Sequence, residues 1–219
     1  RYPKQMWLDG LYMGSPFYAE YAVQHGQLED LVDVAQQFRL MARHAYEPES
    51  GLFYHGWDES KNPEWANPVT GTSSNFWVRG QGWVSMALVD VLDFFPKDHP
   101  ARPEIIKILN DVAAGVVKHQ DPETGLWWQV LDQGGREGNY PEATCSSMFT
   151  YSMAKGINRG YLSRDYVEPV LKGYEGILRD LIRKETHGGG GISLTSCCSV
   201  AGLGYGRDGS YAYYLREPV

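Results

Sequence analysis

Apolar residues recur at steps of three and four in three segments of the chain, which is the spacing of helices that bury one face. These stripes run over residues 28–42, 105–116 and 167–181. Four further segments are richer in aromatic and small residues and poorer in charge, as in helices buried on several sides. They are 9–23, 82–95, 146–160 and 208–215. The order along the chain predicts inner and outer helices in alternation, stacked as helical hairpins.

A short turn sequence occurs twice, after the first and after the second outer helix. It reads E-P-E-S-G-L at 47–52 and D-P-E-T-G-L at 121–126, and a weaker third copy is expected at 184–189. Proline and glycine at these places predict turns, and the aromatic residues that follow, at 53–55 and 126–129, predict short strands. No other segment has a strand pattern. We therefore expect an all-α fold of stacked hairpins, either an open solenoid or a closed toroid.

The length of the chain limits how many hairpins it holds. The inner helices begin at intervals of roughly 62 to 71 residues, so 219 residues hold little more than three hairpins. The sequence starts at Arg1 and stops at Val219 without the features of natural termini. We expect a single toroid domain over residues 1–219, truncated at both ends and containing about three to four hairpins.

Composition and charge narrow the class of ligand. The net charge is −7, which disfavours binding to nucleic acid or to an anionic membrane. No apolar run approaches the roughly 20 residues that a membrane span needs. The cysteines, Cys145, Cys197 and Cys198, have neither the number of a disulfide framework nor the spacing of a metal site. We expect a cytoplasmic or periplasmic protein and leave its oligomeric state open.

Aromatic residues gather where the inner helices begin, and Trp7, Trp77 and Trp83 are the main examples. Indole faces that converge at one end of a toroid stack well on sugar rings. A carbohydrate ligand is therefore predicted, and the alternative is that these tryptophans fill the core.

Asp9 lies in the apolar and aromatic sequence M-W-L-D-G-L-Y-M. Such surroundings favour the neutral form of a carboxyl group, which is the form that a general acid needs. An aspartate at the start of a helix can equally act as its N-cap. The sequence leaves both interpretations open.

His55 and Arg79 are the other candidate polar residues. His55 directly follows the first turn copy, and the second copy has no histidine there, so the repeated scaffold does not require it. It can donate a hydrogen bond to a hydroxyl or a carboxylate. Arg79 lies between Trp77 and Trp83 and beside two glycines, a pattern that suits an anion receptor. The alternative is a structural arginine that bridges a helix end.

Two further segments contain residues that we expect to have a structural role and not a catalytic one. Glu142 stands just before the third inner helix, where Thr144 or Ser146 can provide the cap. The glycine run at 188–191 predicts a turn, since it lacks the lysine and the serine or threonine of a phosphate loop.

Four of these motifs together resemble the unsaturated rhamnogalacturonyl hydrolases of glycoside hydrolase family 105. They are M-W-L-D-G-L-Y-M at 6–13, H-G-W-D at 55–58, W-V-R-G-Q-G-W at 77–83 and D-P-E-T-G-L-W-W-Q-V at 121–130. The resemblance covers essentially the whole chain. It implies an (α/α)6 barrel, of which this chain holds a part, and an activity in pectin degradation.

The resemblance also implies roles for individual residues. Asp9 matches the proposed general acid and base of the family. The matching cleft residues are His55, Arg79 and Trp83, and those that line the sugar site are Trp7, Met13 and Trp77. A second important aspartate of the family lies in an earlier inner helix, upstream of the segment that starts here.

The implied substrate is a small oligosaccharide with a 4,5-unsaturated galacturonyl unit at its non-reducing end. Asp9 would give a proton to C4 while water adds at C5, with the uronate held by Arg79 or His55. This chemistry requires no metal and no organic cofactor. Two alternatives remain open: an unsaturated glucuronyl hydrolase that acts on another polysaccharide fragment, and a non-catalytic carbohydrate-binding α/α module.

Overall fold

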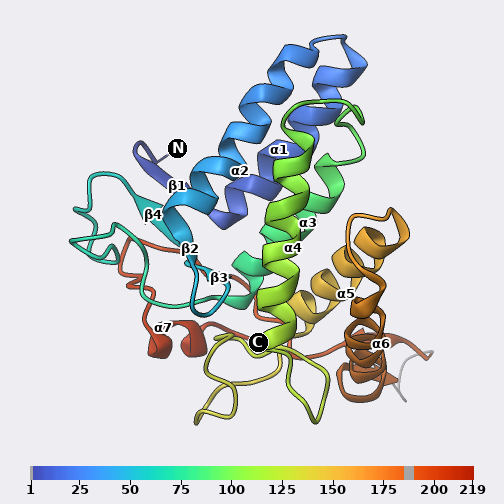
Figure 1. Ribbon diagram of the computed structural model, residues 1–219. Coiled ribbons are helices and arrows are strands. Elements are labelled where there is room, and N and C mark those ends of the chain that lie inside the picture. The colour runs from blue at the N-terminus through green and yellow to red at the C-terminus, as the bar shows by residue number, and fades with distance from the viewer. Residues whose placement is uncertain (1, 185–189) are drawn as a thin grey trace.

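The structure is a computed structural model that describes residues 2–184 and 190–219. Its long helices follow one another in pairs (Figure 1). The pairs are α1 (Leu8–Gln24) with α2 (Leu31–Ala45), α3 (Val78–Val91) with α4 (Arg102–Lys118), and α5 (Ala143–Asn158) with α6 (Val167–Gly176). Short 3₁₀ turns precede α2 and α6, at Leu28–Asp30 and Arg164–Tyr166. A π-helical turn, Ile177–Leu181, extends α6, and a short helix, α7 (Tyr211–Arg216), lies near the C-terminus.

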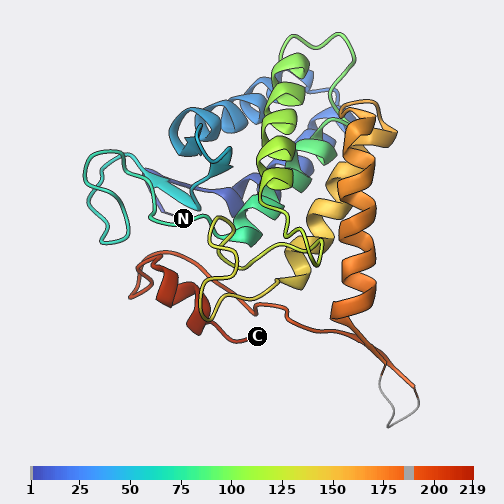
Figure 2. The same ribbon diagram turned by 60° about the horizontal axis from the view of Figure 1, so that its bottom comes forward.

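The first helices of the three pairs lie side by side. α3 packs against both α1 and α5, and each of these helices packs against the one that follows it (Figure 2). α3 is buried on nearly every side, whereas α4 buries a single stripe from Ile105 to Val116. Gly82 permits the close approach of α3 and α5, because a Cβ there would lie 2.6 Å from Met148 Sδ. The predicted all-α fold of alternating inner and outer helices, as in an (α/α) toroid, is confirmed.

The two copies of the turn sequence have the same geometry. The N–H of Gly51 donates to the carbonyl of Glu47, and that of Gly125 to the carbonyl of Asp121, at 2.9 Å in both turns. Both glycines have positive φ values, 78° and 75°, which glycine adopts without strain. The carboxylates of Glu47 and Asp121 each accept two backbone N–H groups of their own turn. The repeated sequence therefore encodes one kind of turn, which follows α2 and α4. The expected third copy, except for Lys184, and the first half of the glycine run at 188–191 fall on residues 185–189, outside the described residues.

The strands next to these turns differ from the prediction. After the first copy, β2 (Tyr46–Glu47) pairs with β3 (Leu52–Phe53), which ends two residues earlier than expected. The strand predicted at 126–129 is wrong, since this segment forms only an isolated bridge between Trp128 and Pro141. Backbone hydrogen bonds flank this bridge on both sides, from Gln129 to Tyr140 and from Glu142 to Trp127. The pairing does not continue into a strand, because Val130 forms its bridge with Trp77 instead.

A short antiparallel pair connects the start of α1 to the segment after the first turn. β1 (Gln5–Trp7) pairs with β4 (Gly56–Asp58), with Trp7 opposite Gly56. The N–H of Leu8 continues the connection by donating to the carbonyl of His55 at 3.0 Å. A further antiparallel pair joins β5 (Ile182–Lys184) to β6 (Ile192–Leu194). These strands are only three residues long, too short to show an alternating pattern in the sequence.

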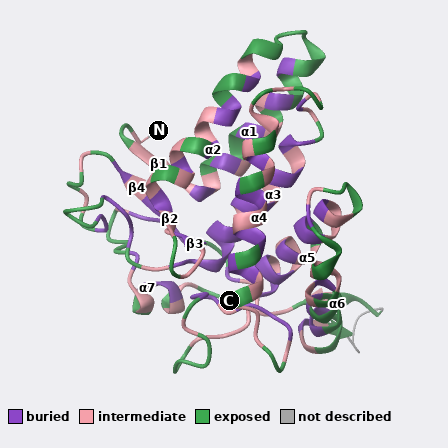
Figure 3. Cartoon of the chain, in the orientation of Figure 1, coloured by how far each residue is buried: buried purple, intermediate pink, exposed green. Residues whose placement is uncertain are grey.

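Buried residues concentrate where the helices face one another and in the segments at one end of them (Figure 3). Large apolar side chains remain exposed on α1, at Met13, Phe17 and Tyr21, and on α6, at Leu171 and Tyr174. None of the helices in the described ranges has both the length and the apolar character of a membrane span.

Candidate active site

Asp9 lies in the first turn of α1 and faces His55. Its Oδ2 is 3.0 Å from Nε2 of His55, and a quarter of its side chain is exposed. The alternative that Asp9 caps the helix is wrong, because α1 begins at Leu8 and the N-cap residue is Trp7. A carboxylate in the first turn still interacts favourably with the positive end of the helix dipole. The side chain is thus held at a helix start and is partly open to a ligand.

His55 is completely buried and has a partner on each ring nitrogen. Nε2 faces Asp9, and Nδ1 lies 2.8 Å from the hydroxyl of Tyr214 in α7. Gly80 at the start of α3 lies beside the ring and Leu8: a Cβ there would be in ordinary contact with Cδ2 of His55 at 3.5 Å and crowded against Cδ1 of Leu8 at 3.0 Å. Residues from the starts of α1 and α3 and from α7 therefore enclose this imidazole.

Tryptophans surround the histidine. The ring of Trp77 lies 4.6 Å from that of His55, and the ring of Trp7 meets it edge-on at 5.8 Å. Trp77 is buried, and its Nε1 has no hydrogen-bond partner among the described residues. Trp7 is partly exposed and stacks on Tyr2. The structure therefore brings Trp7, Asp9, His55 and Trp77 together, as the predicted site requires.

Met13 and Trp83 lie one helical turn farther from this group. Met13 follows Asp9 by four residues, which places both on the same side of α1, and 59% of it is exposed. Trp83 stacks on Tyr12 of α1 with ring centroids 4.9 Å apart. They extend the candidate surface along α1 and α3.

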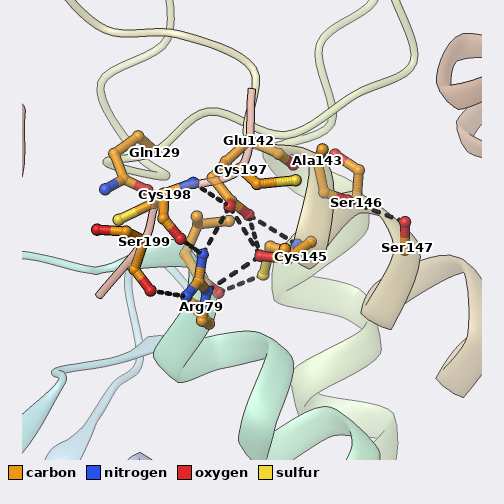
Figure 4. A network of polar contacts seen from close by, with 12 residues as sticks. Arg79, Gln129, Glu142, Ala143, Cys145, Ser146, Ser147, Cys197, Cys198 and Ser199 are labelled. Carbon is orange, nitrogen blue, oxygen red and sulfur yellow. Dashed lines mark hydrogen bonds and ion pairs between the residues drawn. The ribbon is translucent and has the colours of Figure 1, made fainter. Parts of the chain in front are cut away.

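Arg79 points into a buried polar network (Figure 4). Its guanidinium donates to a carboxylate oxygen of Glu142 at 2.9 Å, to the hydroxyl of Thr144 at 3.0 Å, and to the backbone carbonyls of Cys198 and Ser199. Burial alone lowers the pKa of Arg79, but the attraction of Glu142 outweighs it and holds that pKa above the usual value. These contacts are those of the structural alternative, in which the arginine bridges a helix end.

Glu142 is the centre of this network and is fully buried. It is the N-cap of α5, accepting the N–H of Cys145 at 2.7 Å, so the expectation that Thr144 or Ser146 caps this helix is wrong. The glutamate side chain, which is longer than that of a threonine or serine, reaches the helix start and also accepts the N–H of Cys198 at 3.0 Å. The pair Arg79–Glu142 thus joins α3, α5 and the C-terminal segment around the site.

Cavity size does not identify the site. A hollow of about 560 Å³ lies between the end of α2 and the loop 64–74; it is lined by His44, Tyr54, Trp65 and Asp208 among others, but not by Asp9 or His55. A smaller one of about 180 Å³ is lined by Trp7 and Gly10. Within residues 2–184 and 190–219, no group of three or more His, Cys, Asp or Glu side chains is placed to hold a metal ion. The hydrogen-bonded group around Asp9 is therefore the stronger guide to chemistry.

Tyr214 is the residue of this group that the sequence analysis missed. It belongs to the aromatic run Y-A-Y-Y at 211–214, in the fourth predicted inner helix. Aromatic residues at the start of an inner helix were the signal that pointed to the tryptophans, and the same signal was present here. The ring of Tyr214 stacks on Trp77 at an interplanar angle of 11°.

A family model and a solved structure that are similar to this chain both describe glycoside hydrolases. A family model described as Glycosyl Hydrolase Family 88 matches residues 1–219. A solved glycoside hydrolase from family 105 of C. acetobutylicum ATCC 824 is similar in structure, with a TM-score of 0.96 and 44% sequence identity over 99% of this chain. The chain covers 60% of that protein.

Two sequence relatives have different lengths. The 24.9 kDa protein in the picA locus of Rhizobium radiobacter is 39% identical over 214 residues, which are 94% of this chain and 90% of that protein. The unsaturated rhamnogalacturonyl hydrolase of Bacillus subtilis strain 168 is 26% identical over 170 residues, which are 78% of this chain and 45% of that enzyme. The chain thus spans less than half of that named hydrolase. These matches confirm the resemblance to family 105.

Proposed function

The chain belongs to glycosyl hydrolase family 88, and we propose that its activity is the release of 4,5-unsaturated galacturonic acid from the non-reducing end of rhamnogalacturonan oligosaccharides. The observation that carries this proposal is the pair formed by Asp9 and His55, 3.0 Å apart and flanked by Trp7 and Trp77. A proton donor beside aromatic faces suits a reaction on a sugar ring. The name of the Bacillus subtilis relative supports the choice of substrate.

The proposed reaction adds water to the double bond of the substrate. Asp9, in its protonated form, gives a proton to C4, and a water molecule adds at C5 and passes its own proton to the carboxylate that remains. The hemiketal formed at C5 opens, and the oxygen released on C1 then allows that carbon to expel the saturated sugar. One molecule of water is consumed, and Asp9 ends in the form in which it began.

This route gives both proton transfers to one carboxyl group. Hydrolases that attack at the glycosidic carbon instead use two carboxyl groups on opposite sides of the bond. His55 supports the single carboxyl by its hydrogen bond to Oδ2, while Oδ1 has no hydrogen-bond partner among the described residues. Oδ1 is therefore the oxygen proposed to meet the sugar.

Met13 and Trp83 are proposed to extend the surface on which the oligosaccharide lies. Arg79 is proposed to contribute by holding the C-terminal segment in place through Ser199 and Cys198. Four of its five guanidinium N–H groups donate to protein acceptors, so one N–H on Nη1 is left for a direct bond to the uronate.

The substrate is tested with a panel of unsaturated disaccharides. The protein is incubated with an unsaturated galacturonyl-rhamnose disaccharide and, separately, with unsaturated glucuronyl disaccharides, and the loss of the ultraviolet absorbance of the double bond is followed. Faster loss with the rhamnose-linked substrate supports the proposal. Preference for the glucuronyl substrates favours the alternative hydrolase. Binding in calorimetry without any loss of absorbance favours a carbohydrate-binding module.

A further inference from the structure

We propose that Tyr214 is a positioning residue that sets the tautomer of His55 and thereby selects the oxygen from which Asp9 gives its proton. This inference rests on the proposed function, in which Asp9 is the general acid. Tyr214 lies 159 residues from His55 in the sequence, and its hydroxyl is 2.8 Å from Nδ1 of the imidazole.

The hydroxyl of Tyr214 must act as the donor in this contact. Tyr214 is fully buried, and its hydroxyl has no other hydrogen-bond partner among residues 2–184 and 190–219. If it accepted a bond from Nδ1–H instead, its own proton would be buried without an acceptor, which is costly. Burial, together with the nearby Tyr213 and Asp9, raises the pKa of Tyr214 well above its usual value, so the proton stays on the phenol.

A donor at Nδ1 determines the state of the other ring nitrogen. A neutral imidazole carries one proton, so an Nδ1 that accepts a hydrogen bond leaves the proton on Nε2. This N–H then points to Oδ2 of Asp9, 3.0 Å away. An ionised Asp9 also accepts this N–H, whereas a protonated Asp9 can donate to Nε2 instead, so it is in the protonated form of Asp9 that Tyr214 sets the tautomer of His55.

The consequence for Asp9 follows from its two oxygens. Oδ2 accepts the N–H of His55, so the proton of Nε2 already lies between Nε2 and Oδ2 and there is no room for a second proton there. When Asp9 is protonated, its proton must therefore lie on Oδ1, which has no partner among the described residues. Tyr214 in this way directs the acidic proton away from the histidine and onto the other oxygen of the carboxyl group.

The C-terminal segment holds Tyr214 in a fixed place. The side chain of Ser210 caps α7 by accepting the N–H of Tyr213 at 3.1 Å. The side-chain amide of Gln129 donates to the carbonyl of Tyr214 at 3.1 Å, and the Tyr214 ring stacks on Trp77. α7, near the C-terminus, thereby acts through His55 on Asp9 at the start of α1.

The test compares Tyr214→Phe with the matched variant Tyr213→Phe. Each variant removes one phenolic hydroxyl. The hydroxyl of Tyr213 accepts the N–H of Gly202 and is not hydrogen-bonded to His55. The first measurement is the tautomer of His55, read from the imidazole nitrogen and carbon chemical shifts of the full chain without substrate, with the His55 signals assigned by their loss in His55→Asn. The second is kcat and KM on the unsaturated galacturonyl-rhamnose disaccharide.

The proposal expects the Nε2–H tautomer in the wild type and in Tyr213→Phe, and a mixture of tautomers in Tyr214→Phe. It expects kcat of Tyr214→Phe to fall about tenfold, the equivalent of one net hydrogen bond, with KM nearly unchanged. An Nδ1–H tautomer in the wild type would overturn it, as would an unchanged kcat in Tyr214→Phe. The tautomer is measured without substrate, so a failure of the proposed function leaves that result interpretable.

Discussion

Nε2 of His55 lies 3.0 Å from Oδ2 of Asp9, although the two residues are 46 positions apart in the chain. The contact depends on the pairing of β1 with β4, which places Trp7 opposite Gly56 and so brings the start of α1 beside the segment after the first turn. The polar pair is therefore a product of the tertiary structure. It joins a carboxyl group that is partly exposed to an imidazole that is fully buried.

The first prediction concerns His55. His55→Asn removes the imidazole that orients Asp9, and kcat on the unsaturated disaccharide is expected to fall about 10²- to 10⁴-fold, the usual range for a disturbed acid–base group. His25→Asn, at an exposed position after α1, serves as the control and is expected to keep the wild-type rate. Steady-state kinetics on both variants check this, and a His55→Asn variant with the wild-type kcat would contradict the assigned role.

The second prediction concerns the buried ion pair. Arg79→Met leaves the fully buried carboxylate of Glu142 without its cation, and the free energy of unfolding is expected to drop by about 3–5 kcal/mol. Urea denaturation of Arg79→Met, Glu142→Gln and the double variant measures how strongly the two side chains are coupled. The double variant is expected to lose less free energy of unfolding than the sum of the two single variants. Each single variant leaves one buried charge unpaired, whereas the double variant has neither charge. Additive losses would show that the pair acts as two independent residues.

The third prediction concerns a close contact between the first turn copy and α4. A Cβ on Gly115 would lie 1.9 Å from the carbonyl oxygen of Gly51, which is backbone and cannot rotate away. Gly115→Ala is expected to lower the free energy of unfolding by at least about 1–3 kcal/mol, since the helix and the turn must separate.

Gly14→Ala is the matched control for this contact, because a Cβ at Gly14 in α1 meets nothing within 4 Å. Alanine has a higher helix propensity than glycine, so this variant is expected to gain about 0.5–1 kcal/mol. Thermal and urea denaturation of both variants test the pair of expectations. Equal effects in the two variants would mean that α4 does not pack against the turn as described.

The fourth prediction concerns pH and the second turn copy. Burial alone raises the pKa of Asp121, but hydrogen bonds from Thr124, Glu123 and Trp128 outweigh it and hold the pKa below its usual value of 3.8. Because the folded state binds the proton less readily than the unfolded state, the carboxylate stabilises the fold above the unfolded pKa. That contribution disappears as the pH falls through the lower, folded-state pKa.

The measurement is the free energy of unfolding of the wild type and of Asp121→Asn from neutral pH down to acid denaturation. The wild type is expected to be more stable at neutral pH, and the difference is expected to shrink below a pH of about 4. A difference that stays constant down to the acid transition would indicate that the Asp121 carboxylate does not titrate in the way its hydrogen bonds require.

The fold was largely predictable from the sequence because helix periodicity is a local property. The stripes at 28–42 and 105–116 correspond to α2 and α4, and the repeated turn sequence marks the end of each. The strand expected at 126–129 was wrong because the chain changes partner there: Trp128 bridges Pro141, whereas Val130 bridges Trp77. Local pattern alone does not carry that information.

The site was predictable only in part. Asp9, His55 and the neighbouring tryptophans stood out by residue type and position, whereas the contact with Tyr214 spans 159 residues and is set by where α7 packs. Glu142 was underestimated for a similar reason. Its place before a helix suggested no more than a capping segment, while its burial against Arg79 arises from the meeting of α3, α5 and the C-terminal segment.

If the carboxyl group of Asp9 is the proton donor of the proposed reaction, replacing it with an amide removes the donor and nearly preserves the shape of the side chain. The Asp9→Asn variant is compared with the wild type and with Asp98→Asn, which alters an exposed aspartate in the loop after α3, by following the loss of the double-bond absorbance of the unsaturated galacturonyl-rhamnose disaccharide. The wild type and Asp98→Asn are expected to consume the double bond and Asp9→Asn is not, while all three unfold at similar temperatures. A near wild-type rate in Asp9→Asn would contradict it.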